Sequence, residues 1–174
     1  DPNQNIYQFQ GGSDKYLLQY DVPSYKLIIN YRSNKDIVSF VSGISPHKTK
    51  MISKNNSSNK VNIFEGTLDE IEYDIVNELK NTKIDLSKIA VIGPVKRCNV
   101  KHNTYLNLGL SLIANALAKN NIPFLKQYTD THNAKFDTEK IRTIPNHVNL
   151  FTIHGSKGLE FEKVYLLNYH FTTF

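Results

Sequence analysis

Short apolar runs alternate with stretches of helical period along the chain, and this alternation limits the possible folds most strongly. Apolar runs predict strands at 25–30, 61–66, 89–94, 122–127, 148–153 and 163–169. Apolar residues at helical spacing predict helices between Ser33 and Pro46, over 67–80 and over 104–120. Strands that alternate with helices form βαβ units, whose right-handed crossovers place helices on both faces of a sheet. We therefore expect an α/β fold with a mostly parallel sheet.

Capping signals and polar segments complete this outline. Ser33 with Asp36, and Thr67 with Glu70, have the spacing of a capping box at a helix start. Segment 48–60 is rich in Asn and Ser and predicts a surface loop with room for a short strand at its start. Segment 128–146 has no clear period and predicts another loop. We expect one domain over 1–174, with 1–24 as a lead-in segment.

Composition narrows the class of protein. The chain has 174 residues and is 40% hydrophobic, which is enough for a buried core. Its net charge of +5 is compatible with a polyanionic partner. A single cysteine, Cys98, excludes an intrachain disulfide and a cysteine-rich zinc site. No apolar run approaches the ~18 residues that span a bilayer, and no signal peptide opens the chain. We expect an intracellular protein, in cytoplasm or nucleus, with no membrane partner.

Three stretches contain candidate functional residues, and DPNQNIYQFQGG is the first. Tyr7 and Phe9 stand beside two glycines, and exposed aromatic rings can stack on unpaired bases. The alternative is a loop whose aromatic rings pack on the core. In the second stretch, Tyr31 and Arg32 directly follow a predicted strand. The guanidinium of Arg32 suits phosphate oxygens, although a surface ion pair with a carboxylate is the more common reason for such an arginine.

The third stretch, HGSKGLEF, follows the predicted strand 148–153. Gly155 and Gly158 permit a close approach of backbone to a ligand. Three side chains could contact a nucleic-acid backbone or a phosphate: Thr152, His154 and Lys157. Glu160 could accept a hydrogen bond from a ribose hydroxyl. The alternative is a tight connection in which the glycines serve geometry only.

Some nucleotide and metal signals are absent from the sequence. There is no Gly-Lys dipeptide, and so no phosphate-binding P-loop. The one Asp-Glu dipeptide, Asp69-Glu70, opens a predicted helix, whereas a Mg²⁺ site is expected at a strand end. The six histidines lack metal-ligand spacing. We expect no metal site within this chain.

Taken in order, DPNQNIYQFQGG, LIINYRSNKDIV and VNLFTIHGSKGLEFEKVYLLN resemble the UvrD/Rep-type superfamily 1 DNA helicases. The intervening DEIEYDIVNELK, IAVIGPVKR and LIANALAKNNIPF also resemble the second RecA-like motor domain of that family. The resemblance covers nearly the whole chain. It implies a RecA-like fold, a first motor domain in the same polypeptide as partner, and single-stranded DNA as ligand.

The resemblance also implies roles for individual residues. Gln4 and Arg32 would act in catalysis at the γ-phosphate of ATP, Arg32 as an arginine finger. Tyr31 would stack on the adenine. The sugar and phosphates would be contacted by Gly158 and Glu160. The DNA contacts would come from Tyr7, Phe9, Gln10, Thr152 and His154, with Lys157 in the same loop. Gln10 stands where the family usually has Arg, so this DNA contact would lack the charge.

Two departures from the family bear on activity. Segment 128–146 is short where the family often inserts a helical subdomain, and the chain stops before the family's last motif. The P-loop and the Mg²⁺ carboxylates would belong to the first motor domain, so ATP and Mg²⁺ would serve the full-length enzyme. We expect the chain alone to lack ATPase activity. A non-catalytic, helicase-like binding module and a nuclease–helicase fusion are the alternatives.

Overall fold

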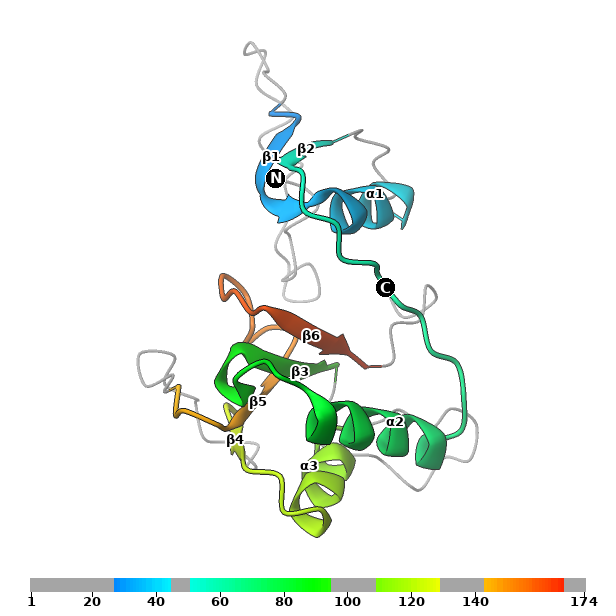
Figure 1. Cartoon of the computed structure of the whole chain (residues 1–174), viewed down its shortest axis with the longest axis vertical. Coiled ribbons are helices and arrows are strands. Elements are labelled where there is room, and N and C mark those ends of the chain that lie inside the picture. The colour runs from blue at the N-terminus through cyan, green and yellow to red at the C-terminus, as the bar shows by residue number, and fades with distance from the viewer. Residues whose placement is uncertain (1–26, 45–50, 95–108, 129–142, 168–174) are drawn as a thin grey trace, which may run out of the picture. The chain divides into compact units, whose positions relative to one another are not determined.

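The computed structural model describes residues 27–44, 51–94, 109–128 and 143–167 (Figure 1). The chain divides into two compact units, Asp1–Phe64 and Glu65–Phe174. One domain over 1–174 stays a prediction, since a domain can contain two such units.

The first unit contains a parallel strand pair and one helix. Strand β1 (Ile29–Asn34) pairs with β2 (Ile52–Asn55), and helix α1 (Lys35–Ile44) follows β1 directly. The register shifts between Asn30 and Asn34. Strand β2 lies within segment 48–60, which we predicted as a surface loop that could contain a short strand. Strand β1, by contrast, extends four residues beyond the predicted end at residue 30.

Helix α1 begins with a different residue from the one predicted. The side-chain oxygen of Asn34 accepts a hydrogen bond from the backbone N–H of Ile37 at 2.9 Å, as an N-cap residue does. The predicted Ser33–Asp36 capping box is therefore wrong. Asp36 instead accepts a hydrogen bond from the hydroxyl of Ser58 at 2.7 Å. Because Ser33 still belongs to the strand, the cap shifts by one residue.

The second unit is built on a four-stranded parallel sheet in the order β4-β5-β3-β6. The strands are β3 (Ile89–Gly93), β4 (Phe124–Lys126), β5 (Val148–Thr152) and β6 (Lys163–Leu166). Every neighbouring pair is parallel, with β5 and β6 on either side of β3. The predicted α/β fold with a mostly parallel sheet is thus confirmed.

Two helices, α2 (Leu68–Asn81) and α3 (Leu110–Lys119), pack against this sheet (Figure 1). Apolar side chains of both helices and of alternate strand positions form one core, which includes Ile75, Leu79, Val91, Ile113, Leu117, Val148 and Leu150. On the edge strand β6, Val164 and Leu166 remain about half exposed. Among the described residues, only one face of this sheet carries helices, and cover on the second face stays a prediction.

The second unit also contains a buried polar pair that the sequence did not reveal. Asn149 is fully buried in β5, and its amide nitrogen donates to the carbonyl of Ser87 at 2.9 Å. Ser87 belongs to the short 3-10 turn η4 (Leu86–Lys88). The side-chain oxygen of Asn149 accepts from the amide of Gln127 at 3.2 Å. These bonds satisfy polar groups that would otherwise destabilise the core.

The predicted strand at 61–66 is wrong. Val61, Ile63 and Phe64 are exposed, and no strand pairs with this segment in the described structure. A short apolar run does not by itself determine structure, because a strand also needs a neighbour that completes its hydrogen bonds. The helix at 67–80 is confirmed by α2. The predicted helix 104–120 is confirmed over α3, while residues 104–108 lie outside the described ranges.

Helix α2 starts at the predicted capping box. The Thr67 hydroxyl accepts from the N–H of Glu70, and the Glu70 carboxylate accepts from the N–H of Thr67 at 2.7 Å. These two bonds lower the pKa of Glu70.

Replacement of Thr67 by Ala should destabilise the second unit by about 1 kcal/mol, because the helix loses its N-cap acceptor. Replacement by Ser keeps a hydroxyl and should retain most of the stability. Urea unfolding followed by circular dichroism measures both variants. Equal stability of the Thr67→Ala variant and the wild type would contradict a role for this cap.

Candidate functional site

The loop 153–162 joins β5 to β6 and leaves the sheet at its carboxyl edge. Thr152, the last residue of β5, pairs with Gly93, the last residue of β3. The N–H of Ile153 donates to the carbonyl of Gly93 at 3.2 Å, so the loop starts directly at the strand ends. Open parallel sheets bind their ligands at this edge.

Thr152 organises the first turn of this loop. Its hydroxyl oxygen accepts from the N–H of Gly155 at 3.2 Å, and its carbonyl accepts from the N–H of Ser156 at 3.0 Å. The Ser156 hydroxyl donates to the carbonyl of Ile153 at 2.9 Å. A Cβ at position 155 would lie 3.2 Å from the Thr152 hydroxyl oxygen. Glycine therefore avoids a crowded contact at this position.

The middle of the loop exposes its polar groups to solvent. His154, Lys157 and Glu160 are all exposed, and Thr152 is partly exposed at the base. Gly158 has a φ of 86°, and a Cβ there would have no heavy atom within 4 Å. A ligand can thus approach the Gly158 backbone closely. The end of β5 and this loop together contain the five predicted site residues of the third stretch: Thr152, His154, Lys157, Gly158 and Glu160.

The far end of the loop is fixed to the sheet by polar and aromatic contacts. The N–H of Glu162 donates to the carbonyl of Lys88 at 2.9 Å, and the two side chains form an ion pair. This contact raises the pKa of Lys88. The ring of Phe161 lies 5.5 Å from the ring of Phe151 in β5.

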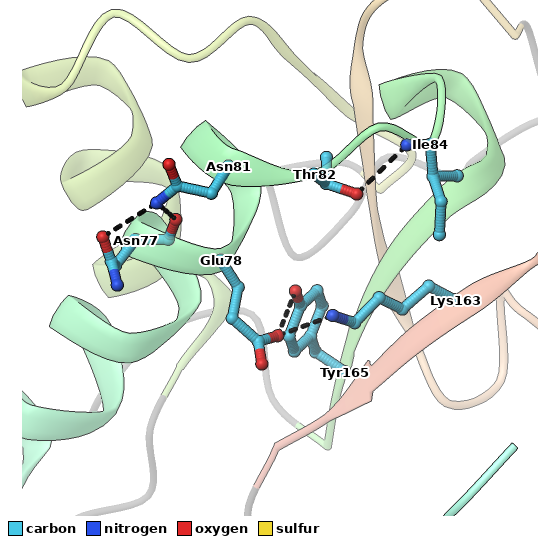
Figure 2. Close-up of polar contacts among 7 residues, drawn as sticks. All are labelled: Asn77, Glu78, Asn81, Thr82, Ile84, Lys163 and Tyr165. Atoms are coloured by element: carbon cyan, nitrogen blue, oxygen red, sulfur yellow. Dashed lines mark hydrogen bonds and ion pairs between the residues drawn. The ribbon is translucent and has the colours of Figure 1, made fainter.

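A cluster of three side chains connects α2 to β6, immediately after the loop (Figure 2). One carboxylate oxygen of Glu78 accepts from Lys163 at 2.6 Å and from the Tyr165 hydroxyl at 2.7 Å. The Lys163 ammonium also lies 4.9 Å from the centre of the Tyr165 ring. Hydrogen bonds from Lys163 and Tyr165 lower the pKa of Glu78, whereas burial raises the pKa of Tyr165. Sequence reasoning missed this cluster.

Tyr31 and Arg32 belong to the first unit, where they lie in the irregular part of β1. The side-chain oxygen of Asn30 accepts from the N–H groups of Arg32 at 2.9 Å and Ser33 at 2.8 Å. These bonds lie where the register of β1 with β2 shifts. The Tyr31 ring is 73% exposed, and Arg32 is exposed as well. Both side chains are therefore accessible, within the strand and not after it as predicted. Asn30 is a supporting residue that the sequence did not single out.

Other predictions lie outside the described residues. Gln4, Tyr7, Phe9 and Gln10 fall in 1–26, as does nearly all of the predicted lead-in segment. Of the predicted loop 128–146, the structure describes Tyr128, which is buried, and 143–146, which form no helix or strand.

Neither a candidate metal site nor a candidate membrane span occurs in the described ranges. No group of three or more His, Cys, Asp or Glu side chains there could bind a metal ion. Within the same ranges, every helix is too short or too polar to cross a bilayer.

Comparison with known proteins finds a family model that matches part of the chain. Residues 125–174, which include β5, the loop and β6, match the family described as "UvrD-like helicase C-terminal domain". The resemblance found in the sequence is thereby confirmed, and the parallel sheet with packed helices agrees with the RecA-like fold that it implied.

A relative extends the similarity to the rest of the chain. The chain is 36% identical over 176 aligned positions to "Putative ATP-dependent DNA helicase R568" of Acanthamoeba polyphaga mimivirus. The alignment covers 98% of this chain and 24% of the relative, so the chain spans about a quarter of the relative's length. No solved structure matches the chain.

Replacement of Gly158 by Ala should destabilise the second unit by about 1 kcal/mol, because a side chain disfavours positive φ even where space is open. Gly43 near the end of α1 is the matched control, since a Cβ there also has no heavy atom within 4 Å. Gly43→Ala should instead stabilise the chain by about 0.5 kcal/mol, through higher helix propensity. Urea unfolding of both variants measures these opposite changes in the free energy of unfolding. A neutral or stabilising Gly158→Ala change would contradict the left-handed conformation.

Proposed function

We propose that this chain is part of the second motor domain of an ATP-dependent DNA helicase. In this proposal it binds single-stranded DNA and completes an ATP site with a first motor domain of the same polypeptide. The observation that carries the proposal is the start of the loop 153–162, which leaves the carboxyl edge of a parallel sheet with exposed polar groups, in a segment that matches a helicase family. The protein would act inside the cell, in cytoplasm or nucleus.

The DNA contacts are assigned to the start of this loop. Thr152 and His154 can hydrogen-bond phosphate or sugar oxygens, and the exposed ammonium of Lys157 can pair with a phosphate. Tyr7, Phe9 and Gln10 would add base stacking and one further polar contact. The chain's net charge of +5 favours this partner.

The nucleotide contacts are assigned residue by residue, and the exposed groups fit ATP in their chemistry. In the first unit, Tyr31 offers an exposed ring for a base, and Arg32 offers a guanidinium for phosphate oxygens. In the second unit, Gly158 exposes its backbone and Glu160 can accept from a ribose hydroxyl. Gln4 would contact the γ-phosphate. In the full-length enzyme, hydrolysis of ATP with Mg²⁺ would supply the free energy. Arg32 would stabilise the charge that develops on the transferred phosphoryl group.

The alternative is a helicase-like module that binds DNA without hydrolysing ATP. It retains the DNA contacts and omits the roles of Gln4 and Arg32. The absence of a P-loop from this sequence is compatible with that alternative and also with our proposal, in which the chain alone does not hydrolyse ATP.

A titration of fluorescently labelled single-stranded DNA, at several salt concentrations, tests the DNA contacts. Lys157→Gln should weaken binding and reduce the slope of log affinity against log salt by about 0.7, as expected for one lost phosphate contact. His154→Ala should weaken binding about fivefold through one lost hydrogen bond.

Two control variants replace the same residue types near the amino edge of the sheet. Lys83 precedes β3 and His147 precedes β5, so Lys83→Gln and His147→Ala should leave the affinity and the salt slope nearly unchanged. Equal effects in the loop and control variants would refute the assignment of DNA to this loop. The same holds if the wild-type chain shows no binding at low salt.

A further inference from the structure

We propose that Glu78 is a positioning residue for the loop 153–162, acting through Lys163 and Tyr165. The inference builds on the proposed function, because that function gives the loop its ligands. Glu78 itself lies in α2, and its carboxylate binds two residues of β6, the strand into which the loop leads. It thereby sets where the second half of the loop ends.

The two halves of the loop are held in different ways. The first half is bonded to the end of β5, through Thr152 and its bonds to Gly155 and Ser156. The second half begins after the bond from Leu159 N–H to the Ser156 carbonyl at 3.1 Å. From there the chain passes the exposed Glu160 and reaches β6 at Lys163. The place of Glu160 therefore depends on how firmly β6 is held, together with the contacts of Phe161 and Glu162 that fix the end of the loop.

Strand β6 needs this support because it is an edge strand of the described sheet. It pairs only with β3 there, and Val164 and Leu166 on one of its faces are about half exposed. On the other face, the Glu78 carboxylate binds Lys163 and Tyr165 at once (Figure 2). Charge-assisted bonds of this kind are stronger than neutral ones and fix geometry as well.

The position of the cluster separates it from general core packing. Glu78 and Lys163 each keep about a third of the side-chain surface exposed, so the contact lies at the rim of the unit. Lys163 directly follows Glu162, whose N–H donates to the Lys88 carbonyl. A displacement of β6 would therefore strain this bond of Glu162 first and have the least effect at Gly155, which Thr152 holds at the end of β5.

Amide hydrogen exchange of the 174-residue chain tests whether the effect declines from Glu162 toward Gly155. In Glu78→Gln, exchange should quicken about two- to fivefold at Glu162 and within β6, less at Leu159, and least at Gly155 and Ser156. Amides of β5 and α3 should keep their wild-type rates. Asp74→Asn is the matched control, since Asp74 is exposed on the same helix and loses the same charge. This control should leave all of these rates unchanged.

Swapping the charges of Glu78 and Lys163 tests whether their ion pair holds the strand. Glu78→Lys alone places two ammonium groups together and should quicken exchange at Glu162 more than Glu78→Gln does. Adding Lys163→Glu restores opposite charges and should return the rate toward wild type. Uniform acceleration across the whole unit would show a purely structural role and overturn the proposal. So would equal rates in Glu78→Gln and Asp74→Asn, or no rescue in the double variant.

Affinity for single-stranded DNA separates this inference from the proposed function. A selective change of exchange in a chain that binds no DNA would uphold the positioning role and refute the function. DNA binding by the wild type, with unchanged loop exchange in Glu78→Gln, would uphold the function and refute the positioning role.

Discussion

The parallel register between β3 and β5 is the constraint on which the second unit depends. It sets Gly93 opposite Thr152, so both strands end at the same edge and the following loop starts there. It also turns Val91 and Leu150 to the face on which α2 and α3 pack. Burial of one strand face and presentation of the loop therefore follow from one set of backbone hydrogen bonds. The polar bonds of Asn149 to η4 and Gln127 add a second restraint on the same strand.

Signals confined to neighbouring residues could be read from the sequence. The Thr67–Glu70 box fixed the start of α2, because both partners lie within one helical turn. The strand at 61–66 failed for the opposite reason: its apolar residues depend on a neighbouring strand that the described structure does not provide. The Asn34 cap was missed because it depended on where β1 ends, which the apolar run alone does not determine.

The candidate site shows the same difference between residues that local sequence reveals and residues that depend on distant partners. Gly155, Lys157, Gly158 and Glu160 were found because they stand within a few residues of one another in a recognisable order. Glu78 was not found, since it lies 85 positions before Lys163 and meets it only through the packing of α2 on the sheet. Asn30 was missed because its bonds to Arg32 and Ser33 lie in an irregular part of a strand that appeared regular from its apolar pattern. Supporting residues of this kind need the fold before they can be recognised.

We propose that the carboxyl edge of the sheet, at the loop after β5, is the DNA-binding face of the second unit. The most direct measurement is the change of backbone amide chemical shifts when an unlabelled oligothymidine is added to the isotope-labelled chain. We predict that, within this unit, the changes cluster at 152–157, at the start of the loop, and spare 83–88 and 143–147 at the amino edge, where the loop ends at the bond from Glu162 to Lys88. Changes centred on the amino edge, with the loop unaffected at saturating oligonucleotide, would contradict it.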